Sequence, residues 1–330
     1  MAYKRSVYQK AKEALDARRA QADQLQQLRH AEVASRCPAV LEAEREMAFC
    51  GAELIRIACQ GENTQEQIAA LSQRSLDAQA RRANALTEAG FAPDYLDAVY
   101  TCPVCKDTGT HGNYYCKCYL DLIRQTAKEN IKGAAQLKKC TFETFSLRYY
   151  SDMPDPALGR SHRQIMSSIC AYLRAYAESF PQDAKSLIML GKTGLGKTHL
   201  SLAVVNRLLD RGFNVYYDSA QGILDRLEKD HFNRNYQDDA LQEDLYKSDL
   251  LVIDDLGTEM VTSFTLSALY QLVNERINDG LPMLFSTNLT PEELEAIYSQ
   301  RLTSRILGTC DILQFYGKDV RQQKAREGTV

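Results

Sequence analysis

The segment from Gly191 to Thr198, GKTGLGKT, is the feature that most restricts what this chain can fold into. An apolar run at residues 187–190 precedes it, and a helix-like segment beginning at His199 follows it. This order of strand, glycine-rich loop and helix is typical of a loop whose backbone N–H groups bind phosphates. In this interpretation Lys197 reaches the outer phosphates, and the Thr198 hydroxyl is a ligand of Mg²⁺. The alternative is a glycine-rich turn that happens to contain lysine and threonine.

A second motif follows about sixty residues later, where the apolar run at residues 250–253 ends in Asp254 and Asp255. The pattern predicts a buried parallel strand with two acids at its tip. Asp254 would support the Mg²⁺ shell, and Asp255 would orient or deprotonate the attacking water. An ordinary exit from strand to loop is the competing interpretation.

Two further segments extend the predicted site. A third strand at residues 282–285 ends in Ser286, Thr287 and Asn288, and Asn288 is the predicted contact to the terminal phosphate or its water. The next helix carries Arg301 and Arg305, one turn apart and without an acidic partner at helical spacing. Such an arginine can act on the nucleotide of a neighbouring subunit. A solvated basic helix face is the alternative.

Together with FSTN, RLTSRI and GKDVR, these motifs resemble the AAA+ ATPases of the bacterial helicase-loader group, DnaC and DnaI, and the related transposition helper IstB. The likeness covers about residues 140–330. It implies an α/β P-loop domain, a parallel sheet flanked by helices, with no C-terminal lid. It also implies that Arg305 acts in trans and that Arg321 contacts the nucleotide in cis. The implied nucleotide contacts are Gly191, Lys192, Thr193, Gly194, Leu195, Gly196, Lys197, Thr198, Asp254 and Arg321.

In this group a helical element after the second strand lines a ring or spiral and touches single-stranded DNA. The corresponding region here is about residues 219–246, where cations alternate with aromatic residues. That combination suits phosphate tracking and base stacking. Lys229, Phe232 and Arg234 are the predicted contacts, and an ordinary amphipathic helix is the alternative.

Four cysteines form a separate constellation, Cys102 and Cys105 followed by Cys116 and Cys118. Two close pairs of thiolates match a tetrahedral Zn²⁺ site, because each pair can bind one ion from a tight turn. His111 is a possible substitute ligand. The alternative is a set of free or buried cysteines in a reducing compartment.

The remaining sequence predicts how the chain is divided. Residues 1–95 are rich in helix formers and predict a helical partner-binding module or a packed bundle. A zinc-binding subdomain is expected at 96–140, with a helix from Tyr119 to about Leu137, then a linker at 141–157 and the AAA+ domain at 158–330. The sequence has no long apolar segment and no signal-type start, so a cytoplasmic protein without membrane contact is expected.

These features combine into one functional expectation. The resemblance implies an ATPase that uses ATP and Mg²⁺, self-associates through its AAA+ domain and delivers a hexameric replicative helicase to single-stranded DNA. The net charge of −3 provides no global basic field, so DNA contacts would be local. An IstB-like transposition helper and a nucleotide-switched adaptor with little turnover are the alternatives.

Overall fold

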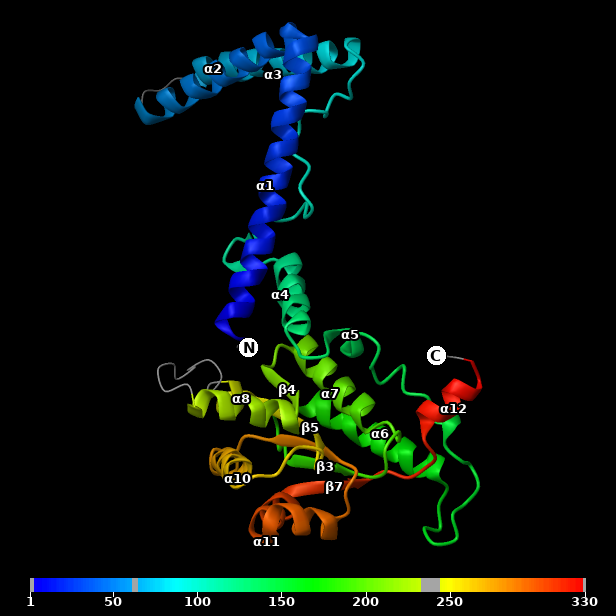
Figure 1. The fold of residues 1–330 in the computed structure, drawn as a ribbon. Coiled ribbons are helices and arrows are strands. Elements are labelled where there is room, and N and C mark those ends of the chain that lie inside the picture. Colours follow the sequence, from blue (N-terminus) through cyan, green and yellow to red (C-terminus); the bar gives the residue numbers. More distant parts are fainter. Residues whose placement is uncertain (1–2, 61–64, 233–243, 329–330) are drawn as a thin grey trace. The chain divides into compact units, whose positions relative to one another are not determined.

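The computed structural model describes residues 3–60, 65–232 and 244–328 (Figure 1). The chain divides into two compact units, one of residues 10–120 and the other of residues 1–9 with 121–330. Residues 121–157, assigned from sequence to a zinc subdomain and a linker, therefore belong to the same unit as the phosphate loop. Across the described residues, no helix combines the length and apolar composition needed to cross a bilayer.

The unit of residues 10–120 is helical and ends in a small two-stranded hairpin. The second and third helices pack against each other, and Val33, Val40, Leu86 and Leu96 form a buried cluster. Gly90 follows the third helix, and its φ of 82° is a conformation that favours glycine. The elements are α1 (Arg5–Arg36), α2 (Pro38–Gln60), α3 (Gln65–Glu88), β1 (Thr110–His111), β2 (Tyr114–Tyr115) and the start of α4 (Lys117–Glu129).

The second unit contains a five-stranded parallel sheet in the order β4-β5-β6-β3-β7. This confirms the predicted α/β fold class, a parallel sheet flanked by helices. The described elements are α5 (Ala134–Leu137), the 3₁₀ turn η1 (Leu147–Tyr149), α6 (His162–Ser179), β3 (Ser186–Leu190), α7 (Lys197–Arg211), β4 (Val215–Ser219), α8 (Ala220–Phe232), β5 (Leu250–Leu256), α10 (Ser263–Asn278), β6 (Met283–Thr287), α11 (Pro291–Thr309), β7 (Cys310–Gln314) and α12 (Val320–Arg326).

Helices cover both faces of this sheet (Figure 1). Successive strand residues point to opposite faces, so an apolar run in a central strand serves two cores. Ile188 and Phe285 belong to the core formed with α8, α10 and α11. Met189 faces the other way, where its sulfur lies 3.8 Å from the Ser201 hydroxyl of α7. Because both faces of these strands are buried, their sequences are continuous apolar runs.

Hydrogen-bonded caps fix where the flanking helices begin. The side chains of Ser161, Thr262 and Thr290 each accept a hydrogen bond from the backbone N–H three residues later, at the starts of α6, α10 and α11. Pro291 occupies the first turn of α11, where its missing N–H costs nothing.

The single helix expected from Tyr119 to about Leu137 is wrong. The chain forms α4 up to Glu129 and then a separate short turn, α5, from Ala134. Gly133 stands between them with φ of 81° and ψ of 26°, a left-handed conformation that cannot continue a right-handed helix. The helix-forming composition on either side concealed this break.

Arg276 of α10 is fully buried and holds together the starts of two central strands. Its guanidinium donates to the backbone oxygens of Leu245, Ser248 and Pro282, each at 2.9 Å. Burial lowers the pKa of Arg276 to about 10. Since the acid-bearing strand β5 and its neighbour β6 begin at these points, Arg276 helps to set the alignment of their tips.

We expect Arg276→Met to lower the free energy of unfolding by about 3 kcal/mol, because three buried carbonyl groups lose their donor. Urea unfolding followed by circular dichroism measures the change. Arg207→Met is the matched control, because Arg207 pairs with Glu178 on the exposed surface of α7. Equal unfolding curves for the two variants would contradict a stabilising role for Arg276.

Candidate functional site

A cavity of about 390 Å³ lies at the carboxyl ends of the central strands. Its walls come from the segment between Gln136 and Tyr150, loop residues 193–199, Asp255, Asn288 and Arg321. Ligands of open α/β sheets bind at this edge, beyond the carboxyl ends of the strands. The structure thus brings together predicted residues that are separated by up to 128 positions in the sequence, from 193 to 321.

The phosphate loop has the backbone conformation that its glycines permit. Gly194 and Gly196 have φ of 79° and 87°, and α7 begins directly after Gly196. The Lys197 ammonium is buried and donates to the backbone oxygens of Gly191 and Lys192 at the base of the loop. Burial lowers the pKa of Lys197, and the negative charges of the two aspartates at the tip of β5 oppose that shift. The loop therefore combines N–H donors with a desolvated cation, as binding of a polyphosphate requires.

Asp254 is buried and surrounded by hydroxyl groups. Its carboxylate accepts hydrogen bonds from the hydroxyl of Tyr217 at 2.7 Å, from Ser286, and from Thr198 at 3.4 Å. Tyr217 and Ser286 come from the strands on either side of β5. Sequence reasoning placed Ser286 near the nucleotide and did not find Tyr217, since its partner lies 37 residues away.

Asp255 follows Asp254 in the chain and lines the cavity. An irregularity in β5 sets its backbone conformation. The register with β6 shifts between Ile253 and Leu256, and Asp255 has φ of 53°. Its N–H donates to the Ser286 hydroxyl at 3.0 Å. Burial raises the pKa of Asp255, and the neighbouring Asp254 carboxylate raises it further. The two adjacent acids therefore occupy different environments.

The oxygen atoms at this position fit Mg²⁺. Two neighbouring ligands of an octahedral ion with bonds of about 2.1 Å lie roughly 3 Å apart. Thr198 Oγ1 and Asp254 Oδ1 are separated by 3.4 Å. A hydroxyl and a carboxylate oxygen are the hard ligands that this ion prefers. The residues present can therefore hold Mg²⁺ beside a bound polyphosphate.

The segment before the ATPase core, for which the sequence predicted a linker, forms one wall of the cavity. The Tyr150 hydroxyl donates to the backbone oxygen of Leu195 at 2.9 Å. A Cβ added to Gly196 would lie 2.9 Å from the Phe145 ring, so this aromatic side chain packs directly on the loop. His199 Nε2 lies 2.9 Å from the backbone oxygen of Thr141.

The segment after β7 closes the other side. The Val320 N–H donates to the backbone oxygen of Gly194 at 2.9 Å, and a Cβ at Gly194 would overlap the Asp319 carboxylate. Asp319 also accepts the N–H of Arg321 at 2.8 Å. This docking places Arg321 in the wall of the cavity.

The two arginines of α11 lie elsewhere. Arg301 and Arg305 line a second hollow of about 600 Å³ together with Thr303, and the nucleotide cavity contains neither of them among the described residues. The Arg305 guanidinium lies 5.5 Å from the centre of the Tyr270 ring. Within the described chain, no carboxylate lies within 4.0 Å of either guanidinium. Both arginines are therefore available to a second molecule.

The predicted DNA contacts are only partly described. Lys229 is exposed on α8. Phe232 is the last residue of that helix, and Arg234 lies outside the described residues. The contact between this segment and DNA stays a prediction.

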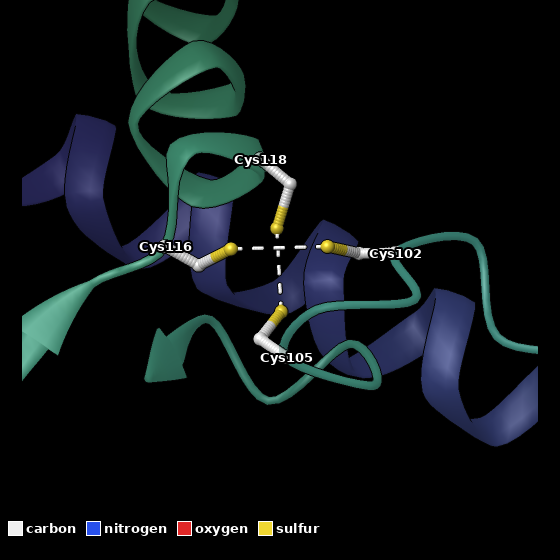
Figure 2. A group of neighbouring side chains, drawn as sticks. All are labelled: Cys102, Cys105, Cys116 and Cys118. Carbon is white, nitrogen blue, oxygen red and sulfur yellow. Dashed lines mark hydrogen bonds between the residues drawn. The ribbon is translucent and has the colours of Figure 1, made fainter. Parts of the chain in front are cut away.

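The four cysteines converge from a turn, which carries Cys102 and Cys105, and from the start of α4, where Cys116 and Cys118 lie. Figure 2 shows their sulfur atoms pointing toward one another. All four Sγ atoms lie within 4.8 Å of one another, with Cys102 and Cys116 at 3.7 Å and Cys105 and Cys118 at 3.4 Å. His111, the alternative ligand, is exposed on β1 and does not belong to this group.

This geometry fits Zn²⁺. Four sulfur atoms at about 2.3 Å from one ion lie roughly 3.8 Å apart, close to the observed separations. A hydrogen bond from the backbone N–H of Cys105 lowers the pKa of Cys102 to about 7, whereas burial and the neighbouring sulfurs raise the pKa of Cys118. Four thiolates this close together would repel one another without a cation, and the set can hold one zinc ion.

The fold and the site define a P-loop nucleotide-binding protein of the α/β class. A family model, IstB-like ATP binding protein, matches residues 162–328. The chain belongs to this family of ATP-binding proteins, so ATP is the nucleotide that the cavity accommodates.

Relatives of known name agree with the predicted resemblance, which is confirmed. The chain is 32% identical over 133 residues to the replicative helicase loader DnaC of Escherichia coli (strain K12), covering 40% of this chain and 54% of that protein. It is 29% identical over 156 residues to the replicative helicase loader DnaI of Bacillus subtilis (strain 168), covering 46% and 47%. The chain spans about half the length of the curated relatives it matches. A crystal structure of the DnaC helicase loader aligns with a TM-score of 0.45 at 19% identity, covering 55% of this chain and 99% of that chain.

We expect the purified chain to contain about one zinc ion, as a four-thiolate site binds. Elemental analysis of the Cys102→Ser/Cys105→Ser double variant should show that the metal is lost. The control is Cys59→Ser/Cys170→Ser, which removes two cysteines outside the cluster. Equal zinc content in both double variants would place the metal elsewhere.

Gly196→Ala should weaken ATP binding about tenfold or more. The backbone at position 196 is left-handed, which alanine disfavours, and the new Cβ would collide with Phe145. Calorimetric titration of the full chain with ATP measures the change. Gly51→Ala is the matched control, since open space surrounds that helical position. Unchanged affinity in Gly196→Ala would show that the loop does not hold the phosphates as described.

Proposed function

We propose that this protein is an ATPase that loads a hexameric replicative helicase onto single-stranded DNA. The observation that carries the proposal is a cavity lined by Lys197, Thr198 and Asp255, with the buried Asp254 carboxylate hydrogen-bonded to Thr198 beside it. Two of the relatives that match this part of the chain are named replicative helicase loaders. ATP binding and hydrolysis would control assembly on the helicase and release from it.

The residues of the cavity divide the chemistry of hydrolysis among them. The loop N–H groups and Lys197 bind the phosphates, and Thr198 and Asp254 would hold Mg²⁺, which neutralises phosphate charge when bound. Asp255 is the proposed general base, because its raised pKa favours proton uptake from the attacking water. Asn288 lines the same cavity and would orient that water. Arg321 would contact the nucleotide in cis.

The same chemistry needs a second copy of the chain. Arg305 lies outside the cavity of its own chain and has no carboxylate partner among the described residues. It would reach the terminal phosphate of a neighbouring copy and stabilise the charge of the transition state. Nucleotide binding would thereby favour an assembly that grips single-stranded DNA through Lys229, Phe232 and Arg234.

The helical unit of residues 10–120 is the proposed helicase-binding part. Exposed apolar side chains are spread over its helices, including Leu28, Phe49, Ile55 and Leu76. These side chains would provide apolar contacts to the helicase. The zinc ion would stabilise the turns that end this unit without taking part in hydrolysis.

A second candidate function is a transposition helper. The family model that matches residues 162–328 describes IstB-like proteins, which favours this alternative for the same ATPase core. Such a protein would act with a transposase on duplex DNA. Preference for duplex over single-stranded DNA would distinguish the two functions.

Native mass spectrometry of the full chain mixed with the replicative helicase of its own host tests the proposal. We expect a complex with several copies of this chain per helicase hexamer in the presence of ATP. A shortened chain that begins at Asp121 should not form it, because it lacks the helical unit.

Two results would contradict this function. Absence of a complex under any nucleotide condition would remove the helicase as partner and favour the transposition alternative. An equally stable complex with the shortened chain would move the helicase contact to the ATPase unit. The full-length Leu28→Ala/Phe49→Ala variant provides a matched comparison, because it changes only exposed positions of the helical unit.

A further inference from the structure

A buried carboxylate lies in the loop that follows the two acids of β5. Glu259 is only 7% exposed, and its carboxylate accepts the N–H of Gly257 at 2.9 Å and the hydroxyl of Tyr298. Tyr298 is 3% exposed and belongs to α11. Burial raises the pKa of Tyr298, and its hydrogen bond to Glu259 raises it further. This pair therefore stays hydrogen-bonded within the core at neutral pH.

The loop that carries Glu259 also contacts the nucleotide cavity. Thr258, the residue before Glu259, lines the cavity and donates its hydroxyl to the backbone oxygen of Asp255 at 2.8 Å. The Thr287 hydroxyl donates to the backbone oxygen of Leu256 at 2.7 Å. The loop is thus held against the tips of β5 and β6, and its position follows that of Asp255.

Tyr298, the partner of Glu259, belongs to α11, the helix that also carries Arg301 and Arg305. Directly after Tyr298, the backbone of α11 is broken at Ser299, which has φ of 71° and ψ of 150°. The helix then resumes with Arg301 and Arg305. Because Ser299 interrupts the helix, the direction of the arginine-bearing part is not fixed by the first part alone. The Tyr298–Glu259 hydrogen bond holds the chain at this break.

We propose that Tyr298 is a positioning residue, which through Glu259 couples the nucleotide site of one copy to the arginine that the same copy offers to its neighbour. The proposal rests on the function proposed above, in which Arg305 acts in trans. It adds that the arginine is presented correctly only when the loop of residues 257–259 is in place. Nucleotide contacts in one cavity are thereby connected to hydrolysis in the next.

Mixed assemblies separate the two roles of a subunit. Arg305→Ala chains keep an intact cavity but offer no arginine, so they act only as acceptors. Asp255→Asn chains offer Arg305 but lack the proposed general base, so they act only as donors. Each variant alone should hydrolyse ATP slowly, and a mixture with donor in excess should recover turnover, measured as phosphate release.

The Tyr298→Phe substitution is then introduced into either the donor chain or the acceptor chain, but not into both. In the donor it removes the hydroxyl that holds the break in α11, and recovery should fall about tenfold, the size expected for a lost hydrogen bond to a buried charged group. In the acceptor the same substitution should change recovery less than twofold. Tyr172→Phe in the donor is the matched control, because that hydroxyl also bonds a carboxylate, Asp311, but on an exposed surface.

The outcomes are distinct. A selective loss with Tyr298→Phe in the donor supports the proposal, and Glu259→Gln in the donor should lower recovery in the same direction if Tyr298→Phe is insoluble. Equal recovery with and without Tyr298→Phe overturns it, as does an equal loss on both sides, which would indicate a general packing role. Failure of the starting mixture to recover any turnover would remove the trans action of Arg305, and the positioning role with it.

Discussion

Two backbone oxygens of the phosphate loop, those of Gly194 and Leu195, are held from outside the loop, and the geometry of the nucleotide site depends on these contacts. The Tyr150 hydroxyl binds the oxygen of Leu195, and the N–H of Val320 binds the oxygen of Gly194. These contacts use the carbonyl oxygens of the loop and leave its N–H groups for phosphates. Segments before and after the core therefore fix a loop whose glycines would otherwise leave it free to change conformation.

The acids of β5 depend on the strands beside them in the same way. Tyr217 from β4 and Ser286 from β6 hold Asp254, while Asp255 turns toward the cavity on a residue with positive φ. Arg276 secures the opposite ends of β5 and β6. A buried acid beside a partly exposed one with a raised pKa gives two carboxylates in different environments, as the two tasks proposed for them require.

Much of this site could be predicted from the sequence, because each motif is short and has one physical purpose. The loop from Gly191 to Thr198, the acid pair after β5 and the two cysteine pairs each specify a local turn and a ligand chemistry. Contacts made across long separations could not be predicted, since nothing local marks their partners. Tyr150 with Leu195 and Tyr298 with Glu259 are of this kind. The break at Gly133 was missed because helix-forming residues surround it on both sides.

Helix α7 extends the influence of the loop to the far side of its own unit. Its first residues are the predicted phosphate contacts, and its last turns contact Tyr3 and Lys128, which belong to the same unit as the loop. The Tyr3 hydroxyl donates to the backbone oxygen of Leu209. Lys128 of α4 forms an ion pair with Asp210 at 2.7 Å. Helix α7 therefore joins the phosphate loop to both of these segments within one unit, since residues 1–9 and 121–330 belong together.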